Sequence, residues 1–286
     1  KMGKLSFVRI RDLESDMQLE IKIDTVGEET YSFFKKLIDS GDFIGAHGEI
    51  FTTQTGEKTL RVETLTFLGK ALKPLPEKFH GLQDTELKYR QRYTDLIMNE
   101  ESRHVFLGRS KLYAFIHKYL GENGFLEVET PILQNAVSGA SAKPFYTHHN
   151  ALDMDCNLRI APETYLKQCI AGGFDRVYEL AKCFRNEGMD TEHLQEFTQV
   201  EWYVSYWDFE DTIKFYKGFI KNMLIELVGT TEIEYQGNIL NFGDYEWPRI
   251  NYVEEMEKIL GCDFLAIEDP LELKKVIVSK GLFTME

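Results

Sequence analysis

The sequence predicts an α+β protein of two domains, a small β-barrel followed by a larger domain built on an antiparallel sheet. Its 286 residues suffice for about two domains. Residues 1–72 contain mostly short runs typical of strands, whereas the later residues combine an alternating hairpin pattern with long amphipathic runs. Prolines and a glycine separate the two regions, which indicates a linker between two folded parts.

Four β-rich runs with one amphipathic helix, Tyr31–Ile38, inserted between the second and third predict an OB-type barrel. The expected strands are Leu5–Ile10, Leu19–Ile23, Phe43–Phe51 and Leu60–Leu68. The segment from Gln54 to Glu57 predicts a hairpin turn. One barrel strand is missing from this pattern, so we expect an N-terminal truncation ahead of Lys1.

The boundary between the domains is expected at Pro74, Pro76 and Gly81, which interrupt both helices and strands. We therefore predict a first domain over residues 1–72, a hinge ending in a charged helix over 73–100, and a second domain over 101–286.

The second domain is expected to begin with a long helix, Glu101–Asn123, and a strand ahead of Pro131. The run NLRIAPETYLKQCIAGG predicts a strand that leads into a helix, with Pro162 in the first turn. Further helices and one hairpin are expected toward the C-terminus: helices Phe209–Val228, Val253–Leu260 and Leu271–Val278, and hairpin Thr231–Phe242.

The central feature of this domain is Arg176–Tyr206, two alternating runs around a long charged loop, which predicts an antiparallel hairpin. Counting by twos places a set of chemically reactive side chains on one face of each strand. These are Glu179, Cys183 and Arg185 on the first strand and Phe197, Gln199, Glu201 and Tyr203 on the second. A guanidinium, an aromatic ring and carboxylates together suit an adenine nucleotide and a cationic partner. An ordinary salt-bridged hairpin is the alternative.

Composition excludes several classes of protein. A net charge of −14 argues against a protein that coats nucleic acid by bulk electrostatics, although a local RNA contact stays open. The hydrophobic content of 43% is typical of a soluble globular protein. Four widely spaced cysteines form no metal-binding pattern and favour reduced thiols, which together with the absence of an export signal predicts a cytoplasmic protein.

The hairpin resembles the second signature motif of class II aminoacyl-tRNA synthetases, in its lysyl-tRNA synthetase version. The residues that carry the resemblance are Phe184-Arg185-Asn186-Glu187-Gly188, His193, Glu196-Phe197-Thr198 and Glu201-Trp202-Tyr203. The hinge from Leu72 to Ile97 and the helix, short strand and proline around Glu101–Pro131 also resemble this family. The resemblance covers essentially the whole chain and implies an OB-fold anticodon-binding domain followed by a synthetase catalytic domain.

The resemblance implies that the protein attaches lysine to tRNA(Lys) through a lysyl-adenylate, with ATP and Mg²⁺. Arg185 would bridge the α-phosphate and the lysine carboxylate as the catalytic residue. Glu187 would accept from the adenine amino group, His193 would reach the distal phosphates, and Phe197 would stack on the base. Glu201 and Tyr203 would hold the lysine ε-ammonium.

The resemblance also assigns two further sets of residues. Gly139 in the loop QNAVSGASAKP and Glu163 of the APE segment would contact the lysine substrate. From the residues alone a plain turn explains Gly139 equally well. A carboxylate at a helix N-terminus is the alternative for Glu163, and substrate contact is favoured there because Ala-Pro-Glu follows a strand directed into the site. Phe7, Gln18 and Glu57 would contact the anticodon. Residues 1–72 hold ten Lys and Arg against twelve Asp and Glu, so such a contact would depend on stacking more than on charge.

Two other functions stay open. An aspartyl- or asparaginyl-tRNA synthetase would share this hairpin, and the run His193-Leu194-Gln195-Glu196-Phe197 is similar to the aspartyl pattern; Glu201 argues against it, because a carboxylate repels an acidic substrate. A non-catalytic RNA-binding paralogue is the second alternative. The resemblance further implies a homodimer.

A third class II motif, a Gly-rich strand and a helix with an Arg, is expected to be absent. The only Arg after Tyr206 is Arg249, which no glycine flanks. The Mg²⁺ ligands are therefore expected beyond residue 286, no metal ligand is assigned within the chain, and residues 1–286 alone are expected to be inactive in adenylation.

Overall fold

A computed structural model of the chain describes residues 3–13, 15–73, 75, 84–188, 190, 192–243 and 247–282. The chain divides into two compact units, Lys1–Leu107 and Gly108–Glu286, referred to below as the N-terminal and C-terminal units. Each is considered by itself. The predicted hinge residues Pro74, Pro76 and Gly81 lie outside the described residues.

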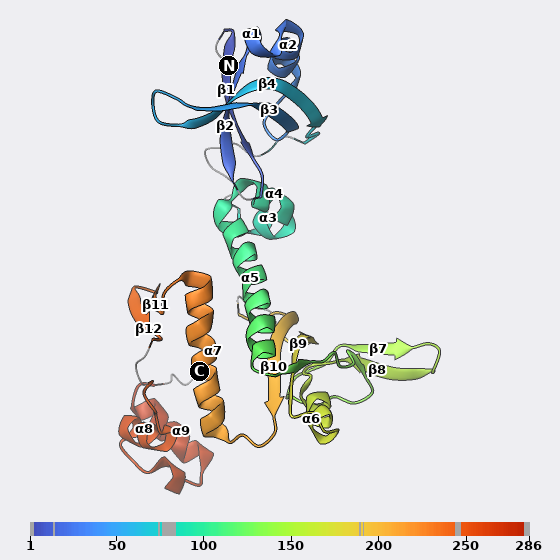
Figure 1. The fold of residues 1–286 in the computed structure, drawn as a ribbon. Helices are drawn as coiled ribbons and strands as arrows, with labels where there is room; N and C mark the ends of the chain where they lie inside the picture. The colour runs from blue at the N-terminus through green and yellow to red at the C-terminus, as the bar shows by residue number, and fades with distance from the viewer. Residues whose placement is uncertain are drawn as a thin grey trace. The chain divides into compact units, whose positions relative to one another are not determined.

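The N-terminal unit contains a four-stranded sheet with the strand order β1-β2-β4-β3 (Figure 1). Its strands are β1 (Leu5–Arg11), β2 (Asp16–Lys22), β3 (Phe43–Thr52) and β4 (Lys58–Gly69). All four predicted strands are confirmed, and so is the turn at Gln54–Glu57, which joins β3 to β4. The sheet is not closed into a barrel within the part of the chain that the structure describes.

Two helices, α1 (Ile23–Val26) and α2 (Glu28–Leu37), lie between β2 and β3. The predicted helix is confirmed but begins three residues earlier than expected, at Glu28 rather than Tyr31. Acidic Glu28 and Glu29 occupy its first turn, and Lys35 and Lys36 its last turn, which suits the helix dipole.

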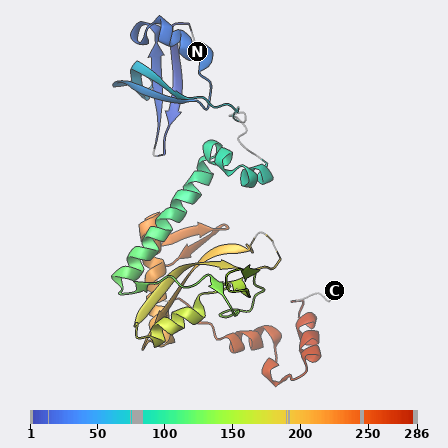
Figure 2. The ribbon, with the colours of Figure 1, turned by 90° about the vertical axis from the view of Figure 1, so that its right-hand side faces the viewer.

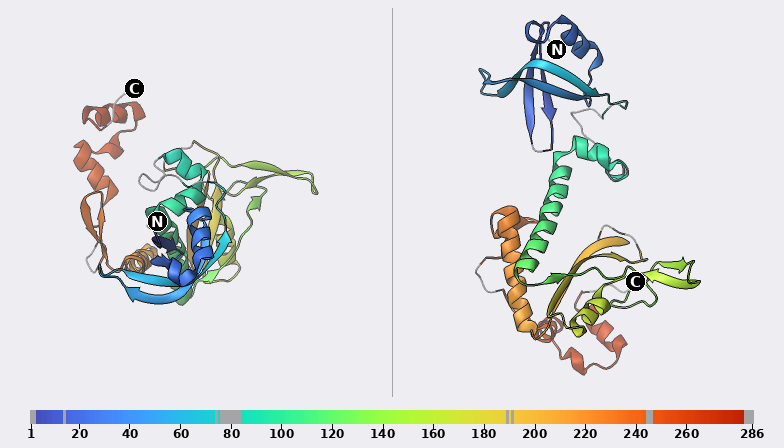
Figure 3. Two further views of the ribbon diagram at one scale, coloured as in Figure 1. Left: turned by 90° about the horizontal axis from the view of Figure 1, so that it is seen from above. Right: turned by 45° about the vertical axis from the view of Figure 1, so that its right-hand side comes forward.

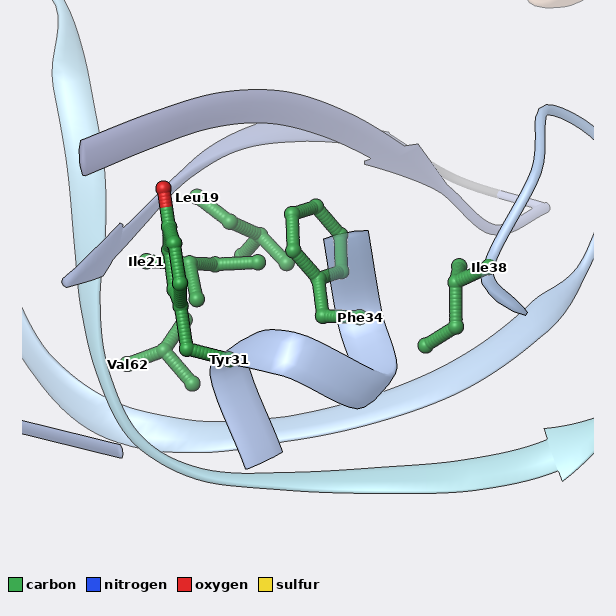
Figure 4. Packing of buried hydrophobic residues seen from close by; sticks show 6 residues of the cluster. All are labelled: Leu19, Ile21, Tyr31, Phe34, Ile38 and Val62. Atoms are coloured by element: carbon green, nitrogen blue, oxygen red, sulfur yellow. The ribbon is translucent and has the colours of Figure 1, made fainter. Parts of the chain in front are cut away.

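The core of the N-terminal unit forms where α2 covers the sheet, as Figure 4 shows. The side chains of Tyr31 and Phe34 point from α2 toward Leu19 and Ile21 of β2. Tyr31 keeps its hydroxyl satisfied inside this core, at 2.9 Å from the Ser6 hydroxyl and 3.1 Å from the Gly3 carbonyl. The alternation of β2 therefore leaves its other face for polar side chains.

Three helices follow in sequence: α3 (Thr85–Arg90), α4 (Arg92–Met98) and α5 (Glu100–Glu122). The charged segment expected as one helix is thus two, because the backbone leaves helical geometry at Gln91. The division between the compact units falls within α5.

The main sheet of the C-terminal unit has the order β10-β9-β5, with β9 (Arg176–Phe184) and β10 (Glu196–Val204) antiparallel and β5 (Leu126–Glu127) parallel to β9. The predicted hairpin is therefore confirmed. Even-numbered side chains of β9 and β10, among them Tyr178 and Trp202, pack on an aromatic core with α5 and α7 (Phe209–Val228). Phe115 of α5 and Phe219 of α7 meet edge to face at 5.4 Å.

A second sheet in this unit has the order β6-β8-β7, with β6 (Leu133–Gln134), β7 (Tyr146–His149) and β8 (Met154–Leu158). The hairpin of β7 and β8 projects from the unit (Figure 3). Strand β8 ends at Leu158, before the APE segment, and α6 (Glu163–Ala171) begins directly after Pro162.

The C-terminal part contains the hairpin β11 (Glu232–Tyr235) and β12 (Asn238–Asn241), then α8 (Tyr252–Leu260), a short 3₁₀ helix (Phe264–Ala266) and α9 (Pro270–Ser279), visible in Figure 2. The predicted hairpin and helices are confirmed here. An Asp208 capping box begins α7, and Asn251 and Asp269 cap α8 and α9, so local sequence explains where each helix starts.

Candidate functional site

The strand register brings the predicted site residues onto one face of the hairpin. Phe197 pairs with Cys183, Gln199 with Ala181, Glu201 with Glu179, and Tyr203 with Val177. Because directly paired residues share a face, the prediction from counting by twos is confirmed. Helix α6 packs against both β9 and β10.

Arg185 follows β9 and lies beside Phe197. Its guanidinium carbon is 5.1 Å from the centre of the Phe197 ring, which is the geometry of a cation–π contact. The Arg185 backbone N–H donates to the Gln195 carbonyl at 2.9 Å, so the base of the loop is closed. The Nε atom of Arg185 is buried and has no hydrogen-bond partner among the described residues. A buried guanidinium N–H without an acceptor favours an anionic ligand at this position.

The small-residue loop 134–144 contacts the hairpin just past Arg185. Asn186 N–H donates to the Lys143 carbonyl at 2.7 Å, and Lys143 N–H donates to the Glu187 carboxylate at 3.3 Å. Glu187 is therefore held by a backbone group rather than by a cation. The sequence analysis missed Lys143, because its contribution is a backbone N–H and carbonyl that any residue could provide.

His193 lies in the charged loop, with its ring Nδ1 2.8 Å from Asp190. Asp190 also accepts from the backbone N–H groups of Glu192 and His193, and these bonds, that of Glu192 first, lower the pKa of Asp190. The His193 side chain is 71% exposed. No hydrogen bond or ion pair joins His193 to Arg185 or Phe197 in the part of the chain that the structure describes.

Glu201 is half-buried and accepts two hydrogen bonds from neutral groups. Tyr203 donates its hydroxyl to Oε1, and Gln199 donates its amide to Oε2, both at 2.9 Å. Burial raises the pKa of Glu201, and these two bonds only partly oppose that effect. Burial and the bond to Glu201 also raise the pKa of the Tyr203 hydroxyl, which stays protonated. The carboxylate is thus oriented without a cation bonded to it.

Gly139 and Glu163, both assigned to the lysine substrate by the resemblance, lie against each other. Gly139 has a φ of +84°, and a Cβ atom there would lie 3.0 Å from the Glu163 Cβ and 3.1 Å from the Ala161 Cβ. Only glycine fits this close approach without strain. The loop backbone therefore packs directly on the first turn of α6.

Glu163 is paired with Lys167, which the sequence analysis missed. The Lys167 ammonium is 2.6 Å from a Glu163 oxygen and 5.8 Å from the centre of the Tyr203 ring. The spacing of four residues along α6 explains the pair. An ammonium group of the chain itself therefore lies among the carboxylates of this face.

A buried ion pair, which the sequence analysis did not predict although it placed Glu179 on this face, lies beside Glu201. Arg159 is 2.6 Å from Glu179, and their side chains are only 3% and 5% exposed. Each is a charged residue inside an otherwise apolar run, LRIA and VYELA, and this unusual placement was the available clue.

A separate set of predicted residues lies on the sheet of the N-terminal unit. Phe7 is 47% exposed, and Gln18 donates its amide to the Thr59 hydroxyl at 3.0 Å. Arg9 pairs with Gln18 across the strands and forms ion pairs with Asp16, at 2.7 Å, and with Glu57. Gln18 and Phe7 therefore share a face with Arg9, which is joined to Glu57 by an ion pair.

All four cysteines are free, as predicted for reduced thiols, and burial raises the pKa of Cys183 to about 11. Among the described residues, no group of three or more His, Cys, Asp and Glu side chains could hold a metal ion. No helix in these residues is both long and apolar enough to cross a membrane.

The fold and this site define a class of protein. Residues 84–279 match the model for tRNA synthetases class II (D, K and N), and residues 1–68 match the model for an OB-fold nucleic acid binding domain. The first match alone covers more than half of the chain, so the chain belongs to the class II tRNA synthetases of this family.

Individual proteins similar to this chain share one name. The chain is 50% identical to "Lysine--tRNA ligase" of Lactococcus lactis subsp. cremoris (strain MG1363) over 290 residues, which cover 98% of this chain and 58% of that protein. It is 46% identical to the proteins of the same name from Pelotomaculum thermopropionicum and Enterococcus faecalis (strain ATCC 700802 / V583), which it matches over 98% and 96% of its length and 55% of theirs. The chain thus spans little more than half the length of these relatives.

Proposed function

We propose that the protein containing this chain is a lysine–tRNA ligase, which forms lysyl-adenylate from lysine and ATP and transfers the lysyl group to tRNA(Lys). The observation that carries the proposal is Glu201, a half-buried carboxylate that two neutral donors orient at the end of the site face. A carboxylate held in this way attracts an ammonium group and repels an acidic side chain.

Each predicted residue takes a role within this proposal. The adenylation step needs alignment and charge neutralisation, because the attacking carboxylate of lysine is already ionised. Arg185, whose buried Nε has a free N–H, would bind the α-phosphate and the lysine carboxylate. Phe197 would stack on adenine, Glu187 would accept from its amino group, and His193 would approach the distal phosphates.

The lysine substrate would lie between β10 and α6. Glu201 and Tyr203 would bind its ε-ammonium. Glu163, against which Gly139 packs, would bind its α-ammonium and would have to release Lys167. The buried guanidinium and the adjacent ring fit a nucleotide, whereas the described residues offer no cluster of metal ligands, so Mg²⁺ would enter as the counter-ion of the ATP phosphates.

We further propose an anticodon-binding domain over residues 1–72, a hinge over 73–100 and a catalytic domain from residue 101 onward. Phe7, Gln18 and Glu57 would contact the anticodon bases, Phe7 through stacking. A homodimer in the cytoplasm is the expected working form. The match of residues 1–68 to a nucleic-acid-binding OB-fold supports the RNA contact.

The test is ATP–pyrophosphate exchange by the polypeptide extended to its natural ends, with each of the twenty amino acids. Exchange that depends on lysine alone supports the proposal. Exchange with aspartate or asparagine would favour the other members of the subclass. Absence of exchange with all twenty, together with retained tRNA binding, would favour a non-catalytic paralogue.

A further inference from the structure

Hydrogen bonds hold both members of the ion pair of Arg159 and Glu179. Arg159 donates from Nε to the Lys182 carbonyl at 2.8 Å, and from Nη1 to both the hydroxyl and the carbonyl of Thr130, at 2.9 and 3.1 Å. The Thr130 hydroxyl donates in turn to Glu179 Oε2 at 2.6 Å. Arg159 therefore ties the segment before β6 to the edge of β9 through two backbone carbonyls.

Glu179 lies directly opposite Glu201 in the antiparallel register of β9 and β10. Residues paired in this way have Cβ atoms about 5 Å apart and point to the same face. Two carboxylates at such a separation oppose each other's ionisation, and burial strengthens this effect. The guanidinium of Arg159 cancels the charge of Glu179, so that the pair beside Glu201 is neutral.

We infer that Arg159 and Glu179 form a charge-neutral ion pair that keeps Glu201 anionic and free to accept an ammonium ion. Each member requires the other. Arg159 alone would leave an uncompensated positive charge beside Glu201 and repel the substrate's ammonium, whereas Glu179 alone would favour protonation of Glu201. Both are positioning residues, because they act on the substrate through Glu201. The inference rests on the proposed role of Glu201 in lysine binding.

Other polar and titratable groups also face Glu201 and must be held constant. Tyr203 and Gln199 lie on its own strand, Cys183 on β9, and Glu163 and Lys167 on α6. The negative charge of Glu163 raises the pKa of Glu201 and the positive charge of Lys167 lowers it. Substitutions at Arg159 and Glu179 leave all of these groups in place, so the pair can be tested separately.

The experiment compares Arg159→Met, Glu179→Gln and the double variant, each in the polypeptide with its natural ends. The first readout is the ¹³C titration of the Glu201 carboxyl group in the unliganded protein, which needs no activity. Arg159→Met should raise the pKa of Glu201 by about one unit or more, and Glu179→Gln should lower it, because the uncompensated charges have opposite sign. The double variant should restore the original value.

The second readout is the pH profile of the KM for lysine in ATP–pyrophosphate exchange. Arg159→Met should move the midpoint of the profile to higher pH, and Glu179→Gln to lower pH, with a KM raised severalfold at neutral pH by repulsion. Arg176→Met is the matched control, because Arg176 also donates to a backbone carbonyl, that of Asn123, but belongs to the even-numbered positions of β9. Its midpoint should equal that of the unaltered protein.

Shifts in the same direction for both single variants, or a raised KM with an unmoved midpoint, would show that the pair has only a structural role and would overturn the inference. If Arg159→Met does not fold, Glu179→Gln and the double variant still test the inference. The pKa of Glu201 should be lowered in Glu179→Gln and unchanged in the double variant. Absence of lysine-dependent exchange in the unaltered protein would refute the proposed function, while the titration of Glu201 would still measure the effect of the pair.

Discussion

The polar faces of the two sheets differ in how their charges are balanced. In the N-terminal unit, Arg9 bridges Asp16 and Glu57, and all three side chains are about 45% exposed. In the C-terminal unit, half-buried Glu201 accepts from two neutral groups and from no cation among the described residues, and the ion pair of Arg159 and Glu179 beside it is almost fully buried. The exposed charges are thus paired with one another, whereas Glu201 on the buried face is the carboxylate that we propose for a ligand.

This difference has an energetic consequence. Exposed ion pairs contribute about 0–1 kcal/mol and can be exchanged for other contacts at little cost, which would suit the proposed RNA-binding role of this face. A buried, oriented carboxylate discriminates strongly between ligands, because its charge acts in a medium of low dielectric constant. Changes on the buried face should therefore have larger effects than changes on the exposed face.

The largest effect is expected for Arg185→Lys. An ammonium cannot reproduce the planar fork that would engage phosphate and carboxylate oxygens together, so the kcat of ATP–pyrophosphate exchange should fall roughly 100-fold with the fold retained. Arg176→Lys is the control, because Arg176 begins β9 at an even-numbered position, away from the site face. Its kcat should stay within about twofold of normal. Exchange within a few-fold of normal in Arg185→Lys would remove Arg185 from its assigned role.

Glu201→Gln should raise the KM for lysine about 10- to 100-fold, because a charge-assisted hydrogen bond of about 1.5–3 kcal/mol is weakened. The amide keeps the shape of the side chain, but its NH2 group replaces one of the two oxygens that accept from Tyr203 and Gln199. The KM for ATP, measured in the same assay, should be nearly unchanged. Normal lysine kinetics would contradict the assignment of Glu201 to the ammonium.

On the exposed face, Phe7→Ala should raise the KM for tRNA by about tenfold, since stacking of one base on an aromatic ring contributes roughly 1–3 kcal/mol. Lysine-dependent pyrophosphate exchange, which needs no tRNA, should be unaffected. Phe43→Ala serves as the matched control, because Phe43 is also an exposed Phe of this unit, at the start of β3. Equal effects of the two substitutions would argue against a specific contact by Phe7.

The pH dependence of lysine binding should report the burial of Glu201. Its pKa is raised above the ordinary value of 4.5, so the KM for lysine should begin to rise on acidification at a higher pH than an exposed carboxylate would cause, by up to about tenfold per pH unit. The folded state also binds more protons than the unfolded state between the ordinary and the raised pKa, so Glu201 lowers stability as the pH rises through this interval. Glu201→Gln should abolish both effects, and a KM profile that Glu201→Gln does not alter would assign the titration to another group.

The elements that the sequence predicted correctly are those determined by local residue patterns. Alternation along Arg176–Tyr206 was sufficient to place Phe197, Glu201 and Tyr203 on one face, because strand geometry fixes side-chain direction with a period of two. Helix α7 was predicted with its observed bounds, Phe209–Val228, since its apolar period and its cap are local. Features that depend only on nearby residues could therefore be predicted from the sequence.

Contacts between segments that are distant in the sequence could not be predicted from local patterns. Arg159 and Glu179 are separated by nineteen intervening residues, and nothing local shows that two buried charges cancel. The contact of Lys143 with Asn186 and Glu187 depends on backbone groups, which carry no sequence signal. The prediction of a single charged helix after the hinge was wrong. The helix breaks at Gln91, where the sequence has no proline or glycine that would indicate a break.

The smallest effect should come from Arg9→Ala. Its ion pairs with Asp16 and Glu57 are exposed and screened by salt, so the free energy of unfolding, measured by urea denaturation of the polypeptide, should fall by less than about 1 kcal/mol. The substitution also leaves two carboxylates without their counter-ion on the face that carries Phe7 and Gln18, so tRNA binding should weaken and the loss should shrink at high salt. Lys70→Ala, another exposed cation of this unit that bridges two carboxylates, Asp39 and Asp42, is the matched control and should leave tRNA binding nearly unchanged. A loss of several kcal/mol in Arg9→Ala would mean that the exposed face is as strongly coupled to the fold as the buried one, and the contrast between the two sheets would fail.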